Sequence, residues 1–292
     1  MTTSKSPAIV VVGSLHYDIV VDAPDRPRKG ETVAGHAWRP KFGGKGGNQA
    51  VAAARAGAKV SMAGAVGDDD FGRFLLDKLS AANIDASRVA RLADVGSGMS
   101  VAISDAGGDY GAVIVSGANL LFKADAAVVA ELVRDTRIVI LQNEMPEATN
   151  IAVARQARAA GAVVCVNAAP YRALSDEFMG LIDVLVVNAI EAEELCGVVV
   201  NNLETAAEAA ESLSARFPSV VVTAGGDGVA ALRRGDMPVC VAALPVDLVS
   251  THGAGDVFVG ALATAIAEER PFAECVDRAN RAAATHVSSV HT

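Results

Sequence analysis

The chain has 292 residues, of which 51% are hydrophobic, 4% aromatic and 20% charged, and its formal net charge is −9. This acidic balance argues against a nucleic-acid binder, which usually carries a basic face. The 4 cysteines are scattered without a C-x-x-C pair, so we expect neither a disulfide framework nor a zinc site. The first residues lack the apolar core of a signal peptide, and no apolar stretch is long enough to span a membrane. We therefore expect a cytoplasmic protein with no membrane or nucleic-acid partner.

Short β-branched apolar runs alternate with helical patterns along the chain. Such runs are typical of strands buried on both faces of a parallel sheet, and their alternation with helices predicts βαβ units. We expect one α/β domain over residues 1–292, with a doubly wound, mostly parallel sheet flanked by helices. The predicted strands are 8–13, 59–65, 138–142, 163–167, 184–188 and 220–223. The predicted helices are 48–56, 71–82, 126–134, 147–160, 203–217, 254–268 and 272 to about 287.

Two stretches interrupt this alternation. Residues 17–42 are rich in Pro, Gly and charge and contain short alternating segments, and residues 98–115 alternate around a predicted turn at 105–109. Both indicate antiparallel strands outside the main sheet. Ligands of open α/β sheets bind at the carboxyl ends of the strands. A small antiparallel sheet over those ends would act as a lid.

Residues 250–256 read Ser-Thr-His-Gly-Ala-Gly-Asp and lead into the helical run 257–267. Glycine lets a backbone approach a ligand closely, and the N–H groups at a helix N-terminus can hold an anion. A carboxylate in that first turn, Asp256, could take a proton from a hydroxyl while the amides hold a transferred phosphoryl group. The alternative interpretation is that Asp256 is the N-cap of the helix.

Residues 42–50 read Phe-Gly-Gly-Lys-Gly-Gly-Asn-Gln-Ala. The segment does not fit the G-x-x-x-x-G-K-[ST] pattern, so we do not expect a P-loop NTPase. Glycines around one Lys and one Asn favour a backbone that packs close to a polar ligand. The alternative is a flexible turn before a helix.

Together, and in this order, these two segments resemble the signatures of the ribokinase-like (PfkB) family of carbohydrate kinases, and within it the ribokinases. Residues 43–50 are similar to the N-terminal signature, and residues 251–256 to the C-terminal signature D-T-x-[GA]-A-G-D. The resemblance covers nearly the whole chain. Weaker matches lie at Gly13-Ser14, Asp18, 66–69, 143–146, 167–170, Asn188 with Glu191, and Thr223 with Gly225 and Gly228.

The resemblance implies a kinase that uses ATP and Mg²⁺ to phosphorylate a hydroxyl of a small sugar, such as the pentose D-ribose. It implies Asp256 as the catalytic base, with the amides of Gly253, Ala254 and Gly255 as an anion hole. The implied sugar-binding residues are His16, Asp18, Gly44, Lys45, Asn48, Glu144 and Asp256. The implied nucleotide-binding residues are Asn188, Thr223, Gly225, Gly228, Gly255 and Asn280, and Glu191 would hold Mg²⁺ through water.

The implied roles have structural alternatives. Asp18 could be a turn residue, and Glu144 could be a carboxylate at the N-terminal end of a helix. Glu191 lies in an acidic helix with Glu193 and Glu194, a pattern that usually marks a solvated face.

The chain departs from the family pattern in several places. His16 stands where ribokinases commonly have Asn, and its larger ring changes the donors and acceptors that would face the sugar. Ser250 stands where the signature has an Asp that helps to bind an activating cation, so K⁺ activation is doubtful. Family members usually continue beyond the position of Thr292 through a further helix, so we expect a weakened nucleotide affinity.

Two alternative functions stay open at this point, a nucleoside kinase of the same family and a non-catalytic sugar- or nucleotide-binding protein on the same fold. Lys45 and Glu144 favour a free sugar, and Asp256 with its glycines favours an enzyme. The resemblance implies a dimer, because lid sheets often pair in this family, and an uncovered sheet edge also favours pairing. We therefore expect a homodimer formed through the lid.

Overall fold

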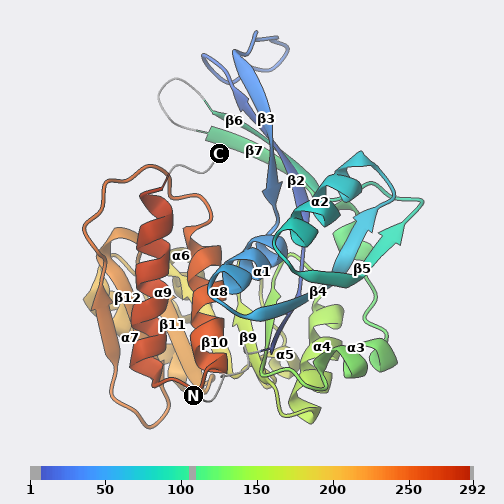
Figure 1. The fold of residues 1–292 in the computed structure, drawn as a ribbon. Coiled ribbons are helices and arrows are strands. Elements are labelled where there is room, and N and C mark those ends of the chain that lie inside the picture. Colours follow the sequence, from blue (N-terminus) through green and yellow to red (C-terminus); the bar gives the residue numbers. More distant parts are fainter. Residues whose placement is uncertain (1–7, 105–109, 290–292) are drawn as a thin grey trace.

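The computed structural model describes residues 8–104 and 110–289. Its main sheet has the strand order β13-β12-β11-β10-β9-β8-β1-β4-β5 (Figure 1). Every neighbouring pair from β11 to β5 is parallel, and β12 and β13 are antiparallel additions at one edge. The predicted doubly wound, mostly parallel α/β fold is therefore confirmed.

The strands of the main sheet are β1 (Ala8–Val12), β4 (Lys59–Gly67), β5 (Asp85–Leu92), β8 (Ile138–Gln142), β9 (Val163–Asn167), β10 (Val184–Asn188), β11 (Ser219–Thr223), β12 (Gly228–Arg233) and β13 (Val239–Ala242). The helices are α1 (Lys45–Arg55), α2 (Asp70–Ala81), α3 (Ala126–Val133), α4 (Glu147–Ala159), α5 (Asp176–Met179), α6 (Ala189–Cys196), α7 (Leu203–Ser214), α8 (Ala254–Ala267) and α9 (Phe272–Val287), with 3₁₀ turns η1 (Gly117–Leu121) and η2 (Gly225–Asp227).

The two faces of the sheet carry separate apolar cores. In β1, Ile9 and Val11 belong to the core under α1, α2, α8 and α9, whereas Val10 and Val12 belong to the core under α3, α4, α6 and α7. This division follows from the period of two along a strand, which sends successive side chains to opposite faces. Both sets are buried, so β1 is apolar at every position, as expected for a central parallel strand.

The strand order reverses between β1 and β8. From β1 the chain first builds β4 and β5 on one side, and it then crosses to build β8 and the following strands on the other side. In a doubly wound sheet, a crevice forms at the carboxyl ends of the strands where the order reverses. The fold therefore places a candidate ligand site beside the residues that follow β1 and β8.

A second sheet, the lid, consists of β2 (His16–Asp22), β3 (Ala37–Gly43), β6 (Met99–Ser104) and β7 (Tyr110–Val115), in the order β3-β2-β6-β7. Its outer pairs are antiparallel, as predicted, and its central pair β2–β6 is parallel. Figure 1 shows these strands projecting beyond the main sheet. The turn predicted at 105–109 lies outside the described residues.

Helix α1 begins three residues before its predicted start at residue 48, so Gly46 and Gly47 belong to its first turn. A Cβ at Gly46 would lie 2.6 Å from the carbonyl carbon of Gly13, and one at Gly47 would lie 2.7 Å from the ring of Phe42. Helix α1 can therefore approach the end of β1 closely only because these positions are glycine. The interpretation of this segment as a flexible turn is wrong.

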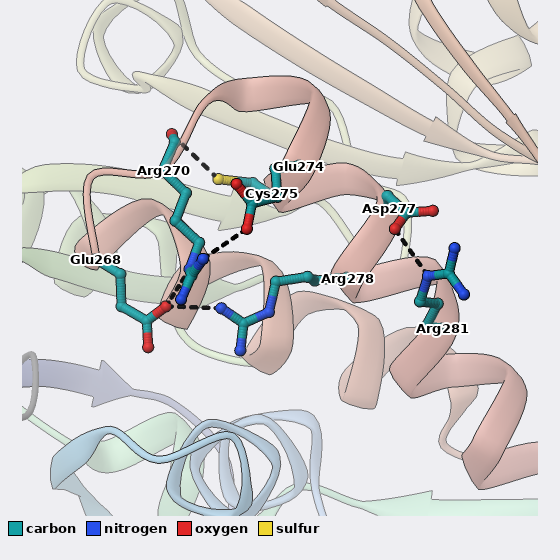
Figure 2. A network of polar contacts seen from close by, with 7 residues as sticks. All are labelled: Glu268, Arg270, Glu274, Cys275, Asp277, Arg278 and Arg281. Carbon is teal, nitrogen blue, oxygen red and sulfur yellow. Dashed lines mark hydrogen bonds and ion pairs between the residues drawn. The ribbon is translucent and has the colours of Figure 1, made fainter.

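Helices α8 and α9 form an antiparallel pair, and ionic contacts surround their connection (Figure 2). Glu268, which caps the C-terminus of α8, accepts hydrogen bonds from Arg270 and from Arg278 of α9. Arg270 also binds Glu274. Burial disfavours the charged form of Glu268, but the hydrogen bonds from the two arginines outweigh it and lower the pKa of Glu268. The network fastens the end of α8 that lies far from the crevice.

Within the described parts of the chain, no helix is both long and apolar enough to cross a membrane.

The network predicts a modest, pH-dependent contribution to stability. We expect Glu268→Gln to lower the free energy of unfolding by about 0.5–1 kcal/mol at pH 7, since partly exposed ion pairs are screened by solvent. The folded-state pKa of Glu268 lies below its ordinary value of 4.5. The contribution is therefore fully present above about pH 4.5 and is lost as the pH falls through the folded-state pKa.

Urea unfolding of both proteins at pH 7 and at pH 3.5 measures this difference. The exposed Glu194, replaced by Gln, is the control and should change little at either pH. A loss of stability in Glu268→Gln that is equally large at both pH values would contradict the ionic explanation.

Candidate active site

Two helices begin at the crevice, and their N-termini are occupied differently. Helix α1 starts with Lys45, whose backbone N–H donates to Oε2 of Glu144 at 2.9 Å. Ser14 supports the same turn, because its carbonyl accepts the N–H of Gly47 at 2.9 Å and its hydroxyl donates to Glu144. A protein carboxylate therefore already neutralises the positive end of the α1 dipole.

The N-terminus of α8, in contrast, is not bound by a described carboxylate. The helix begins after Gly253, which has the left-handed φ of 81°, and no side chain among the described residues caps its first turn. Ala254 donates its N–H to the carbonyl of Thr251 at 3.2 Å. Gly255 is exposed, and a Cβ built on it would have no heavy atom within 4 Å. The open N-terminus of α8, rather than that of α1, therefore has room for an anionic ligand.

Of the three amides predicted for the anion hole, that of Ala254 is thus already bonded within the loop. Gly253 has a left-handed φ and Gly255 is exposed, and their place in the anion hole stays a prediction. Asp256 is the third residue of α8 and makes no capping bond, so the alternative interpretation of Asp256 as an N-cap is wrong.

The carboxylate of Asp256 is buried and bound by two amides. Its side chain is only 7% exposed. Asn48 donates to Oδ2 at 3.1 Å, and Gln49 donates to Oδ1 at 2.9 Å. Burial raises the pKa of Asp256 above its ordinary value of 3.8, while Lys45 and the two amides act in the opposite direction. A buried base with a raised pKa at a helix N-terminus is suited to accept a proton from a ligand hydroxyl.

Asp18 lies on β2 at the base of the lid, close enough to Glu144 for that carboxylate to affect its pKa. Ser100 on β6 donates its hydroxyl to Oδ1 of Asp18 at 2.6 Å. A Cβ at Gly43 on the neighbouring β3 would lie 2.0 Å from Oδ2, so only glycine leaves room for this carboxylate. Burial raises the pKa of Asp18, and Ser100, His16 and Lys41 partly offset that increase. Asp18 lies within strand β2, which rules out the alternative of a turn residue.

His16 is buried at the junction between β1 and the lid. Its side chain is 4% exposed, and its Nε2 has no hydrogen-bond partner among the described residues. The Cδ2 atom lies against Gly98, where a Cβ would come within 2.5 Å. A buried imidazole nitrogen without a partner is costly, so it favours a polar ligand at this position.

Gly44 joins β3 to α1 with a φ of 84°. A Cβ there would lie 2.8 Å from both the backbone nitrogen of His16 and the carbonyl oxygen of Ser14. The backbone geometry alone therefore requires glycine at this position, whether or not a ligand contacts it.

Lysines supply the positive charge in this region. Lys45 is close enough to influence the pKa values of both Asp256 and Glu191. Lys41 of β3 pairs in register with Asp18, and burial lowers the pKa of Lys41. Lys45 thus lies near both the predicted base and the predicted Mg²⁺ ligand.

Asn188 and Glu191 form a capping box at the start of α6. The Asn188 side chain accepts the N–H of Glu191 at 2.9 Å, and Glu191 accepts the N–H of Asn188 at 2.9 Å. Glu191 is 5% exposed, whereas Glu193 and Glu194 are exposed, so the solvated-face alternative is wrong for Glu191. Burial raises the pKa of Glu191, and the Asn188 amide and Lys45 counteract that effect.

The predicted nucleotide-binding positions fall into two groups. Thr223 pairs in register with Asn188 at the carboxyl ends of β11 and β10, and Gly225 beyond it is exposed with a φ of 56°. Gly228 and Asn280 make structural contacts at the sheet edge, and their contact with a nucleotide stays a prediction. A Cβ at Gly228 would lie 2.1 Å from the carbonyl oxygen of Val241, and Asn280 donates to the carbonyl of Ala242 at 2.9 Å.

The loop before α8 carries no carboxylate at the position that suggested a cation site. Ser250 is exposed, and its hydroxyl accepts the N–H of His252 at 3.3 Å. Nε2 of His286 lies 2.9 Å from the carbonyl oxygen of His252. Asp247 is exposed. Ser250 thus presents a neutral hydroxyl, which is a weaker K⁺ ligand than the carboxylate of the family signature.

The described residues contain no group of three or more His, Cys, Asp or Glu side chains that could hold a metal ion by themselves. A site of one carboxylate, Glu191, beside the amide of Asn188 still fits Mg²⁺. This ion usually keeps several waters and takes phosphate oxygens from its substrate.

Several residues of the site were not assigned from the sequence. Gln49 and Gln142 are both fully buried, and Gln142 donates to Oε1 of Gln49 at 2.8 Å. Ser14 was noted only as part of a motif, and Asn119 not at all. Asn119 bonds both the N–H and the carbonyl of Leu15, each at 3.0 Å. For Gln49 a signal was available, since it directly follows Asn48 in the glycine-rich motif.

Known proteins resemble this chain over nearly its full length. The pattern of the pfkB family of carbohydrate kinases matches residues 6–292. The ribokinase of Bacillus subtilis is 36% identical over 282 residues, which are 96% of this chain and 93% of that protein. The deoxyribokinase of Salmonella typhi is 33% identical over 258 residues, which are 87% of this chain and 84% of that protein.

A solved structure of Arabidopsis thaliana ribokinase, complexed with ribose and ATP, has the same fold. It superposes with a TM-score of 0.91 and 30% sequence identity, covering 99% of this chain and 95% of that chain. The matched segments include the glycine-rich start of α1 and the start of α8, on which the candidate site depends. This chain belongs to the pfkB family of carbohydrate kinases.

Proposed function

We propose that this protein is an ATP-dependent kinase that transfers the γ-phosphoryl group to a hydroxyl of a pentose, as a ribokinase does. The observation that carries the proposal is the buried Asp256 carboxylate at the open N-terminus of α8. The B. subtilis and A. thaliana ribokinases support the pentose as substrate class, and the complex with ribose and ATP supports ATP as the donor. The Salmonella deoxyribokinase keeps 2-deoxyribose among the pentoses to be tested.

In this proposal the sugar binds between the lid and α1. Asp18, Asn48 and Glu144 would accept or donate hydrogen bonds to its hydroxyls, since carboxylates and amides can distinguish hydroxyl positions. Asn48 would move from Asp256 to the sugar and release Oδ2 for the acceptor hydroxyl. His16 would determine which pentose fits, because its buried Nε2 has no hydrogen-bond partner among the described residues and could bind a sugar hydroxyl.

Asp256 would take the proton from the acceptor hydroxyl as the phosphoryl group is transferred. The uncapped amides at the start of α8 would stabilise the charge on that group, and Lys45 would add a positive charge on its other side. Asn188, Thr223 and Gly225 would contact the nucleotide. Mg²⁺ would neutralise phosphate charge, held through water by Glu191. We assign no monovalent cation, because Ser250 stands where the family signature has the carboxylate that helps to bind one.

The base assignment predicts the effect of Asp256→Asn. The variant keeps the size of the side chain but cannot accept the hydroxyl proton, so we expect kcat to fall about 10²–10⁴-fold. ADP release from Mg-ATP measures this across ribose, 2-deoxyribose, hexoses, sugar acids and nucleosides, and phosphorus NMR identifies the sugar phosphate. Asp176→Asn, at an exposed first-turn position of α5, should leave kcat unchanged.

Turnover of a pentose that survives unchanged in Asp256→Asn would contradict the role of this residue. Turnover of a nucleoside but of no free sugar would contradict the substrate class.

The assignment of Glu191 predicts a separable effect on Mg²⁺ dependence. Because glutamine can also serve in a capping box, Glu191→Gln should keep α6 intact while removing the charge. We expect about a tenfold higher Mg²⁺ concentration for half-maximal rate, with a melting temperature close to that of the wild type. Glu193→Gln, on the exposed side of the same helix, is the control. If the Mg²⁺ dependence of Glu191→Gln is unchanged, Glu191 acts only as a helix cap and its assignment to Mg²⁺ is wrong.

The lid also supports the proposal of a homodimer. Strand β7 is an edge strand of the lid, and the side chains of Val113, Ile114 and Val115 are 68%, 58% and 51% exposed. Apolar side chains open on both faces of an edge strand favour pairing with another strand. A second copy of this chain offers the same edge.

The dimer predicts that Val113→Lys weakens association, because a charge would be placed in the interface. Light scattering at micromolar protein should give twice the chain mass for the wild type and a lower mass for the variant. Val199→Lys, at a 56% exposed position between α6 and α7, should remain dimeric. A monomeric wild type would rule out the dimer.

A further inference from the structure

A chain of buried amides leads from the main sheet to the carboxylate of Asp256. Gln142, the last residue of β8, donates from Nε2 to Oε1 of Gln49 at 2.8 Å. Gln49 in turn donates from its own Nε2 to Oδ1 of Asp256 at 2.9 Å. Both glutamine side chains are fully buried, and Asp256 is 7% exposed. Three elements, β8, α1 and α8, are thus connected by side-chain hydrogen bonds behind the predicted base.

The direction of these hydrogen bonds is determined by the carboxylate. An ionised carboxylate only accepts, so Gln49 must point its NH₂ group toward Asp256 and its oxygen toward Gln142. Gln142 must then point its NH₂ group toward Gln49. This leaves Oε1 of Gln142 without a partner among the described residues, directed at Gly13, where a Cβ would come within 2.0 Å. A buried oxygen without a partner is costly, and it indicates that the orientation serves the carboxylate.

The two donors to Asp256 are not equivalent. Asn48 is half-buried and belongs to the proposed sugar-binding residues, so it is free to exchange its bond for one to the sugar. Gln49 accepts a hydrogen bond from Gln142 and donates one to Asp256. The reversed orientation of its amide group would lose both bonds. We propose that Gln49, oriented by Gln142, is a positioning residue that keeps Oδ1 of Asp256 occupied and leaves Oδ2 to take the proton of the acceptor hydroxyl. This inference rests on the proposed kinase function.

The proposal has a consequence for the protonation of Asp256. Burial and Glu144 raise the pKa of Asp256, whereas Lys45, Gln49 and Asn48 lower it. Loss of the Gln49 donor would therefore raise the pKa further. A hydrogen bond to a charged group corresponds to about one pKa unit or slightly more. Because the base acts only when deprotonated, the acidic limb of the pH–rate profile should move upward by about the same amount.

The test compares Gln49→Met, Gln142→Met and Thr264→Val with the wild type. Gln49→Met removes the donor with little change in size. Gln142→Met changes no residue that touches Asp256, but it removes the hydrogen bond that orients the amide of Gln49. Thr264 is a matched control, because its buried hydroxyl contacts the carbonyls of Ala53 on α1 and Gly260 on α8 without reaching Asp256.

The first readout is the pH profile of kcat/KM for the pentose. We expect the acidic limb to shift upward by about one pH unit in Gln49→Met and by less in Gln142→Met, with the rate largely recovered at high pH. Thr264→Val should overlay the wild type. Where Gln49→Met does not fold, Gln142→Met alone carries the test.

The second readout needs no substrate. The ¹³C carboxyl resonance of Asp256, identified by its loss in Asp256→Asn, reports its titration directly, and the same shifts are expected. If the wild type has no kinase activity but these titrations shift, the proposed function fails while the amide chain stands. Unshifted titrations and profiles in both glutamine variants, or an equal shift in Thr264→Val, would overturn the inference.

Discussion

The constraint on which the site depends is the burial of one negative charge, the carboxylate of Asp256, at the start of α8. A buried carboxylate must be compensated by hydrogen bonds or by opposite charge. Here Asn48, Gln49 and Lys45 supply both, and all three come from α1. The two helices must therefore lie close together, which explains the small residues between them. A Cβ at Gly260 of α8 would come within 2.6 Å of the Cβ of Ala52 on α1.

Close packing of backbone segments is also required where α1 meets the end of β1. Helix α1 can reach the crevice because Gly46 packs against the backbone of Gly13. Its N-terminus is neutralised by Glu144, which follows β8, so the open N-terminus of α8 remains the anion-binding end. The strand-order reversal between β1 and β8 brings these segments together. The chemistry proposed for the site thus depends on close backbone packing at least as much as on the identity of the charged residues.

Strands and helices with strong apolar patterns were predicted from the sequence. Elements whose formation depends on contacts with distant parts of the chain were not. Strand β5 alternates polar and apolar residues at an edge of the sheet, and β12 and β13 surround glycine-containing turns, so none of them was predicted. The glycines at the start of α1 disfavour a helix locally. They are helical all the same, and their close approach to Gly13 and Phe42 leaves no room for a side chain at either position. The parallel pairing of β2 with β6 likewise depends on residues far apart in the chain.

In the candidate site, too, some residues were predicted from motifs and others have roles that depend on tertiary contacts. Asp256, Asp18 and Glu144 were predicted from motifs, and in the structure Glu144 lies close enough to influence the pKa values of both aspartates. Gln142 could not be found from the sequence, because its role depends on an amide from another element. Glu191 serves as a helix cap as well as a predicted metal ligand, which motif spacing alone cannot separate. His16 differs from the family pattern, and its burial and the lack of a partner for its Nε2 among the described residues indicate why the difference matters.

The most direct test of the central claim is a crystal structure of this protein with ribose and a non-hydrolysable ATP analogue. The account predicts one sugar hydroxyl within hydrogen-bond distance of Oδ2 of Asp256, about 2.6–3.2 Å, with Gln49 still bound to Oδ1. It also predicts the γ-phosphate facing the backbone at Gly255. A sugar bound away from Asp256, or a γ-phosphate away from the start of α8, would contradict the account.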